Sequence, residues 1–200
     1  MSPIEYKIFA EYVRQLVNDI PRVVYEGTAS VFCIGLVVFV AWKGFKRGIR
    51  YSLLLLLADY VFLIFCSTVF CRATKEARKY DFHPFWSYRA IQDGQVNLLP
   101  QNIMNVVVFM PVGLLLGIIF RQMTWWKAFL TGFGISVSIE TLQFVFHKGF
   151  CEIDDIMHNT LGCLIGYLFC QGGKKILLAD SIIQFFRHPI GTTYTPSLRR

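Results

Sequence analysis

The fold is decided by residues 136–166, SVSIETLQFVFHKGFCEIDDIMHNTLGCLIG, where two apolar segments each carry one stripe of polar and small residues. The spacing within each stripe is i, i+4, i+7 and i+11, which keeps its members on one face of an α-helix. The first stripe is Ser136, Glu140, Gln143 and His147, and the second is Asp155, Asn159, Gly162 and Gly166. The stretch therefore predicts two antiparallel helices, joined by a short turn, with their polar faces turned inward.

The rest of the chain extends this pattern of long apolar segments. Of its 200 residues, 54% are hydrophobic and only 16% charged, and the mean hydropathy is +0.48. Soluble domains carry about 25% charged residues. The sequence predicts an all-α integral membrane protein, a bundle of about five transmembrane helices. We expect these spans at 23–42, 51–70, 102–120, 126–146 and 155–171.

Segments of different character flank the spans. Residues 4–20 alternate apolar and charged positions at helical spacing and end at Pro21, which predicts an amphipathic helix at the membrane interface. The charged N-terminal residues argue against a cleavable signal peptide. We therefore divide the chain into an interfacial segment at 1–22, a transmembrane domain at 23–172 and a basic, amphipathic tail at 173–200.

The net charge of +7 is spread over short loops beside the apolar segments. Basic residues in such places orient the spans and meet anionic lipid, so we expect no nucleic-acid partner. A slight excess of basic residues on one side favours an outside N-terminus and a cytoplasmic C-terminus. Four of the six cysteines lie within apolar runs and are expected to pack as small side chains. Cys71 and Cys151 are left as a possible disulfide pair.

Polar residues on three of the expected spans converge. The third span starts, the fourth ends and the fifth starts on the same side of the membrane. Glu140 lies roughly 10 Å inside the end of its helix at about 1.5 Å per residue. One shallow pocket is predicted to hold Asn105, Glu140, Gln143, Asp155 and Asn159.

The carboxylates of this pocket favour a functional role, because an ionised group inside a bilayer costs at least ~2.5–3.5 kcal/mol. We predict Glu140 and Asp155 to be catalytic, Glu140 as general acid or base and Asp155 as its electrostatic partner. The predicted substrate-binding residues are Asn105, Gln143, Asn159, Ser136 and Lys148, the last for a phosphate. The alternative is structural, since amides and hydroxyls also join helices through hydrogen bonds worth about 0.6 kcal/mol each.

A metal site is the weaker hypothesis for the acidic run. Glu152, Asp154, Asp155 and His158 lie within seven residues, and carboxylates with one imidazole can hold a divalent cation. Paired acids at a helix N-terminus also act as caps and suit the helix dipole. We predict no metal, keep Asp154, Asp155 and His158 as the candidate ligands, and assign no cofactor.

The same residues resemble the VanZ-like family of membrane proteins. The resemblance covers 97–168, in the right order and on successive spans. The matching elements are NLLP at 97–100, NxxxFxPxG at 105–113, SxxxExxQ at 136–143, CEIDDIMHNTLG at 151–162 and GY at 166–167. The family often has an arginine shortly before the acidic run, where this chain has Lys148. Lysine keeps the charge but lacks the bidentate fork.

The resemblance implies a cell-envelope protein associated with lowered susceptibility to lipid-tailed glycopeptides such as teicoplanin, with no settled reaction. Three functions are compatible with the residues. The chain is an enzyme acting on a membrane lipid or lipid-linked envelope intermediate, a non-catalytic binder of such a lipid or of the drug, or a small transporter. The sequence leaves the oligomeric state open.

Overall fold

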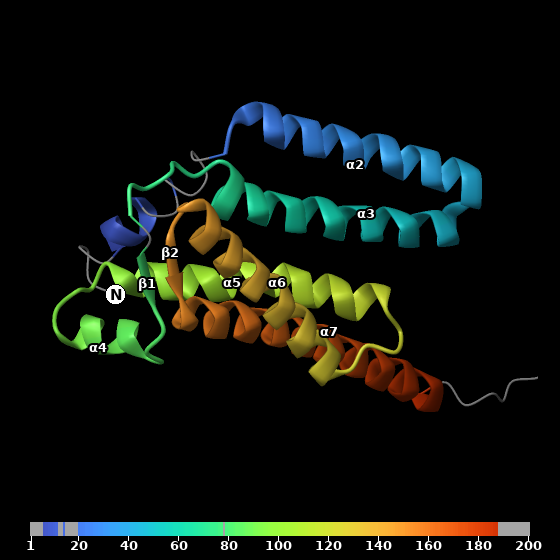
Figure 1. Ribbon diagram of the computed structural model, residues 1–200. Coiled ribbons are helices and arrows are strands. Elements are labelled where there is room, and N and C mark those ends of the chain that lie inside the picture. Colours follow the sequence, from blue (N-terminus) through green and yellow to red (C-terminus); the bar gives the residue numbers. More distant parts are fainter. Residues whose placement is uncertain (1–5, 12–13, 15–19, 78, 188–200) are drawn as a thin grey trace, which may run out of the picture.

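A computed structural model describes residues 6–11, 14, 20–77 and 79–187, with side chains throughout except at 45–47, 79 and 175–187. Figure 1 shows long helices lying roughly side by side, with the small elements gathered at one end. Within the described residues, four helical segments are long and apolar enough to cross a membrane: Arg22–Lys43, Gly48–Phe70, Leu98–Ile119 and Trp125–Phe146. The all-α membrane fold predicted from composition is therefore correct.

The first two spans form a hairpin. α2 (Arg22–Lys43) packs along α3 (Phe45–Phe65), and the π-helical turn η1 (Cys66–Phe70) continues α3. A tight turn at Gly44 with φ of 72° joins them, a conformation that glycine adopts without strain. None of the residues of α2 is buried within the chain. The hairpin touches the remaining helices through α3, where the Tyr60 hydroxyl donates a hydrogen bond of 2.9 Å to the carbonyl of Val108.

The other three long helices form the core bundle. They are α5 (Leu98–Ile119), α6 (Trp125–Phe146) and α7 (Ile153–Arg187), and α7 packs against both of the others. α7 runs beside α5 in Figure 1 and covers the fifth span expected from the sequence, but it is not among the four helices that are long and apolar enough to cross a membrane. The core residues Phe109, Ile139 and Cys163 are each no more than 1% exposed.

Close contact between α5 and α7 depends on glycine. Gly162 and Gly166 lie directly on the α5 backbone, where an added methyl group would overlap the carbonyl oxygens of Val106 and Met110. Gly113 on α5 meets the carbonyl of Cys163 in the same way. Small residues at such seams let transmembrane helices approach closely. This seam presses the polar first turns of α7 against the start of α5.

One end of the bundle is covered by short elements. β1 (Lys79–Asp81) pairs in parallel with β2 (Phe150–Glu152), Tyr80 lying opposite Cys151, and α4 (Trp86–Gln92) follows β1. Figure 1 places α4, β1 and β2 at the same end of the bundle. These pieces connect the loop after the second span to the turn between α6 and α7.

The expected span boundaries differ from the observed ones chiefly at the ends. The third helix begins at Leu98 instead of 102, and the fifth begins at Ile153 and reaches Arg187 instead of 171. Residues 6–11 and 14 are helical, within the predicted interfacial helix, and the other residues predicted for it up to position 19 lie outside the described residues. So does the end of the predicted tail, at 188–200. The division into segments stays a prediction.

Candidate functional site

A sharp turn after α6 brings the two acidic regions together. His147 ends α6 in the left-handed conformation, with φ of 55°, and the chain reverses into β2 within three residues. As a result the backbone N–H of Glu152 donates a hydrogen bond of 3.0 Å to Oε2 of Glu140. Two carboxyl groups that are twelve residues apart in sequence thus share one site.

The site is a cavity of about 260 Å³ between η1, α5, α6, β2 and the start of α7. Its wall includes all five residues that the spacing placed in one pocket, Asn105, Glu140, Gln143, Asp155 and Asn159. Glu140, Gln143 and Asn159 are no more than 6% exposed, whereas Asn105 and Asp155 are half-buried. The structure therefore brings the predicted carboxylates and amides into one enclosure.

Hydrogen bonds fix most of these side chains. Asn105 donates to Oδ1 of Asp155 at 2.7 Å, and Asn159 donates to the Ser136 hydroxyl at 2.9 Å. Ser136, predicted to bind substrate, lies behind Asn159 and outside the cavity wall. The amide nitrogen of Gln143 donates to the carbonyl of Thr68, but its oxygen is buried without a hydrogen-bond partner among the described residues. That oxygen can therefore accept a hydrogen bond from a ligand.

Sequence reasoning missed several polar side chains in the wall, among them Arg72, Gln101 and Glu152. Glu152 was considered only as a metal ligand; it is 2% exposed and accepts a hydrogen bond of 3.1 Å from the indole N–H of Trp86. Gln101 hydrogen-bonds to the carboxyl groups of Glu152 and Asp155. The only available signal for Arg72 was its place directly after the second span.

Lys148, which was predicted to bind a phosphate, lies outside the cavity wall. Its ammonium group donates a hydrogen bond of 2.7 Å to the backbone carbonyl of Arg72 and does not line the cavity. Lys148 therefore fixes the backbone at Arg72. The guanidinium of Arg72 lines the cavity, and its positive charge acts on the carboxyl groups of Glu140 and Asp155. Unlike the ammonium of lysine, a guanidinium can form two parallel hydrogen bonds.

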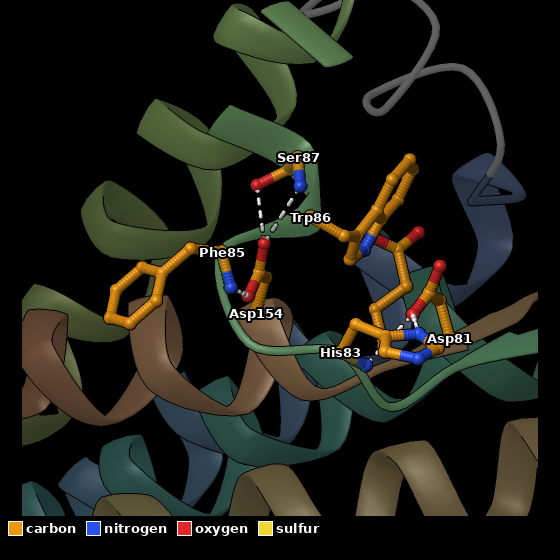
Figure 2. A network of polar contacts seen from close by, with 7 residues as sticks. Asp81, His83, Phe85, Trp86, Ser87 and Asp154 are labelled. Carbon is orange, nitrogen blue, oxygen red and sulfur yellow. Dashed lines mark hydrogen bonds and ion pairs between the residues drawn. The ribbon is translucent and has the colours of Figure 1, made fainter. Parts of the chain in front are cut away.

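Asp154 points away from the cavity and holds the loop before α4. Figure 2 shows its carboxylate between Phe85 and Ser87. It accepts hydrogen bonds from the backbone N–H of Phe85 at 2.6 Å and from the N–H and hydroxyl of Ser87 at 3.0 and 2.6 Å. Asn102 in turn donates to the Ser87 hydroxyl at 3.0 Å. Asp154 is thus a structural anchor for the loop before α4.

The three candidate metal ligands do not meet. Asp155 lines the cavity, Asp154 binds the loop, and Nε2 of His158 is hydrogen-bonded to the Tyr88 hydroxyl at 2.7 Å. Successive helical residues point about 100° apart, so neighbours on α7 face different partners. Within the part of the chain that the structure describes, no group of three or more acidic, histidine or cysteine side chains is arranged to hold a metal ion.

Cys71 and Cys151, considered as a disulfide pair, are both free thiols, as are the other four cysteines. Cys151 is buried on β2, where burial and the nearby charges of Glu140, Asp155 and Glu152 raise its thiol pKa from 9.0 to about 11. The thiolate is the reactive form.

This pKa predicts slow labelling of Cys151. In a variant whose only cysteine is Cys151, maleimide should react about 100-fold more slowly at pH 7.5 than with an ordinary thiol, because the thiolate fraction falls by that factor. The reference is a cysteine introduced at Gln95, an exposed residue at the same end. Equal labelling rates at the two positions would contradict the burial of Cys151 beside the acidic residues of the cavity.

The environment of Glu152 predicts a pH-dependent stability. Burial, followed by the charge of Asp155, raises the pKa of Glu152 from 4.5 to about 8. Because the folded pKa exceeds the unfolded one, the stabilisation is complete below pH 4.5 and is lost as the pH rises through 8. The melting temperature of the purified protein should fall between pH 5 and 9.

Glu152→Gln should flatten this dependence, because the amide stays neutral at every pH. Asp93→Asn, which removes an exposed carboxylate at the same end, is the matched control and should leave the slope unchanged. An unchanged slope in Glu152→Gln would contradict a raised pKa for Glu152.

Fold and site together define a polytopic helical membrane protein with an acid-lined cavity at one end of its bundle. The chain belongs to the VanZ/LLP1 family, whose sequence model matches residues 31–178. Over 66 residues it is 36% identical to Protein VanZ of Enterococcus faecium, a region that makes up 33% of this chain and 41% of that protein. The matched region thus spans less than half of this curated relative. No solved structure is significantly similar.

Proposed function

We propose that this protein is a membrane enzyme that modifies an envelope lipid or lipid-linked intermediate and thereby lowers susceptibility to teicoplanin. One observation carries the proposal: three carboxyl groups, those of Glu140, Glu152 and Asp155, line one small cavity together with Arg72. Acids enclosed in this way are costly for folding, and such clusters are typical of catalytic sites. Membership of the VanZ/LLP1 family supports the setting in glycopeptide resistance, which the family resemblance implies.

Glu140 is the general acid or base of this proposal. One of its oxygens, Oε2, accepts from the backbone N–H of Glu152, which holds the carboxyl group in place. Its carboxyl group remains able to take a proton from a substrate hydroxyl or return one. Asp155 is held by Asn105 and stabilises the charge that develops beside Glu140. Asn159 and the unpartnered oxygen of Gln143 orient the substrate.

Arg72 takes the phosphate-binding role that was predicted for Lys148. Arg72 and Lys75 both line the cavity, and a guanidinium can grip a phosphate with two parallel hydrogen bonds. Acids beside cations fit a substrate that carries both hydroxyl groups and a phosphate. A lipid-linked phosphate of the envelope has this chemistry and lies in the membrane within reach of the cavity.

A non-catalytic binder is the second candidate. An apolar groove of about 590 Å³ lies on the other face of α7 and is lined by aromatic and aliphatic residues, among them Phe85, Phe129, Phe133 and Leu161. Such a groove suits a lipid or the acyl tail of a glycopeptide. A binder would lower susceptibility by holding the lipid or the drug away from its target, without changing either. A transporter is favoured by no specific feature.

Drug selectivity tests the proposal. Expression of the protein in a susceptible host should raise the inhibitory concentration of teicoplanin several-fold and leave that of a glycopeptide without a lipid tail within twofold. The empty vector is the control. An equal rise for both drugs would point to general envelope thickening, and no rise for either would overturn the proposed setting.

A further inference from the structure

A second groove lies at the end of the bundle opposite the acidic cavity. It has a volume of about 740 Å³ and is formed by the start of α3, the end of α5, the turn between α5 and α6, and the first turns of α6. In Figure 1 this turn lies at the end of the bundle away from α4, β1 and β2. The groove and the cavity therefore lie at opposite ends of the helical bundle.

Three cationic side chains line the groove, those of Arg50, Arg121 and Lys127. All three are exposed, and no acidic residue is part of the lining. Among the described residues none of the three has a carboxylate within ion-pair distance. The ammonium of Lys127 makes one long hydrogen bond of 3.4 Å to the Gln122 carbonyl. The groove thus concentrates positive charge that the protein itself does not neutralise.

The remaining wall of the groove is apolar. Leu116 and Phe120 from α5 and Trp126 and Leu130 from α6 lie beside the cations. Trp126 is exposed and follows the exposed Trp125, and tryptophan prefers the headgroup level of a membrane. Cations at this level with an apolar wall beside them match a lipid whose headgroup is anionic and whose chains extend into the bilayer.

We propose that this groove binds an anionic phospholipid, with its phosphate held by Arg50, Arg121 and Lys127 and one acyl chain lying against Phe120 and Leu130. Basic pockets between transmembrane helices bind such headgroups on the cytoplasmic side. The bound lipid places this end in the cytoplasmic leaflet. The acidic cavity and the start of α2 then lie on the outer side. The site is independent of the reaction proposed above.

Native mass spectrometry of the full chain tests the site. The protein is released from detergent after titration with phosphatidylglycerol or phosphatidylcholine, and retained lipid is counted. We expect wild type to retain phosphatidylglycerol in preference. Each surface cation near anionic lipid contributes about fivefold, so Arg50→Gln, Arg121→Gln and Lys127→Gln together should weaken retention on the order of 100-fold.

The matched control removes the same net charge elsewhere, through Arg22→Gln, Lys43→Gln and Arg89→Gln, none of which lines the groove. It should change retention by less than about threefold. Equal weakening in both triple variants would show general charge attraction and overturn the site. Equal retention of the two lipids by wild type, or full displacement of phosphatidylglycerol by inorganic phosphate, would overturn it as well.

Discussion

Glu140→Gln is expected to abolish the decrease in teicoplanin susceptibility while the protein still accumulates in the membrane. General acid–base groups contribute about 10²–10⁴-fold to a rate, so their loss leaves too little turnover to protect a cell. Glutamine has the same shape, and its carbonyl oxygen can still accept the hydrogen bond from the N–H of Glu152. The substitution therefore removes the proton-transfer group with little effect on packing.

Two controls make this result interpretable. Immunoblotting of membranes shows whether the variant accumulates, and Asp93→Asn, at an exposed carboxylate outside the cavity, should keep the full phenotype. Full activity of Glu140→Gln would rule out the enzyme. A partial loss would favour the binder, and in that case changes in the apolar groove, such as Phe133→Ala, should weaken the phenotype more. Trp86 is unsuitable for this comparison, since its indole N–H is bonded to Glu152.

Gly166→Ala is expected to be strongly destabilising. A methyl group at this position would overlap the carbonyl oxygen of Met110, a backbone atom that cannot move without shifting α5. Overpacking in a close-packed interior costs typically 1–3 kcal/mol, and a clash with backbone lies at the upper end. The melting temperature in detergent, followed by size-exclusion chromatography, should fall by several degrees.

Gly134→Ala is the matched control, because a methyl group there meets no atom within 4 Å. Alanine also has the higher helix propensity, by about 1 kcal/mol, so this variant should be as stable as wild type or slightly more stable. If Gly166→Ala has the same melting temperature as Gly134→Ala, the close approach of α5 and α7 is wrong. The position of Asp155 against Asn105 would then be wrong too.

Much of the fold follows from the sequence because a bilayer demands long apolar helices. Residues 126–146 were predicted within one residue of α6, because the tryptophan pair marks the start of the apolar run. His147, predicted on the polar stripe of this helix, instead ends it in the left-handed conformation. The third and fifth helices begin earlier than predicted because α5 starts at Leu98 within the NLLP element and α7 starts directly after β2. Strands of three residues carry too little periodicity to be recognised.

The cavity residues on the helices could be predicted from their spacing. Glu140 and Gln143 share one helix face, and so do Asp155 and Asn159. Arg72 and Glu152 were not placed because they lie in connections, where no period relates a residue to its neighbours. Their positions depend on the parallel pairing of β1 with β2 and on the bond from Lys148 to the backbone of Arg72. Such long-range contacts are absent from a local pattern.

The lipid composition of the envelope tests the central claim most directly. Lipids and lipid-linked precursors are extracted from matched cells that express wild type, Glu140→Gln or no protein, and are compared by mass spectrometry. The account predicts a species that is new, or depleted, only in cells with the wild-type protein. Identical profiles in all three strains, with resistance present in the first, would contradict an enzymatic role for the cavity.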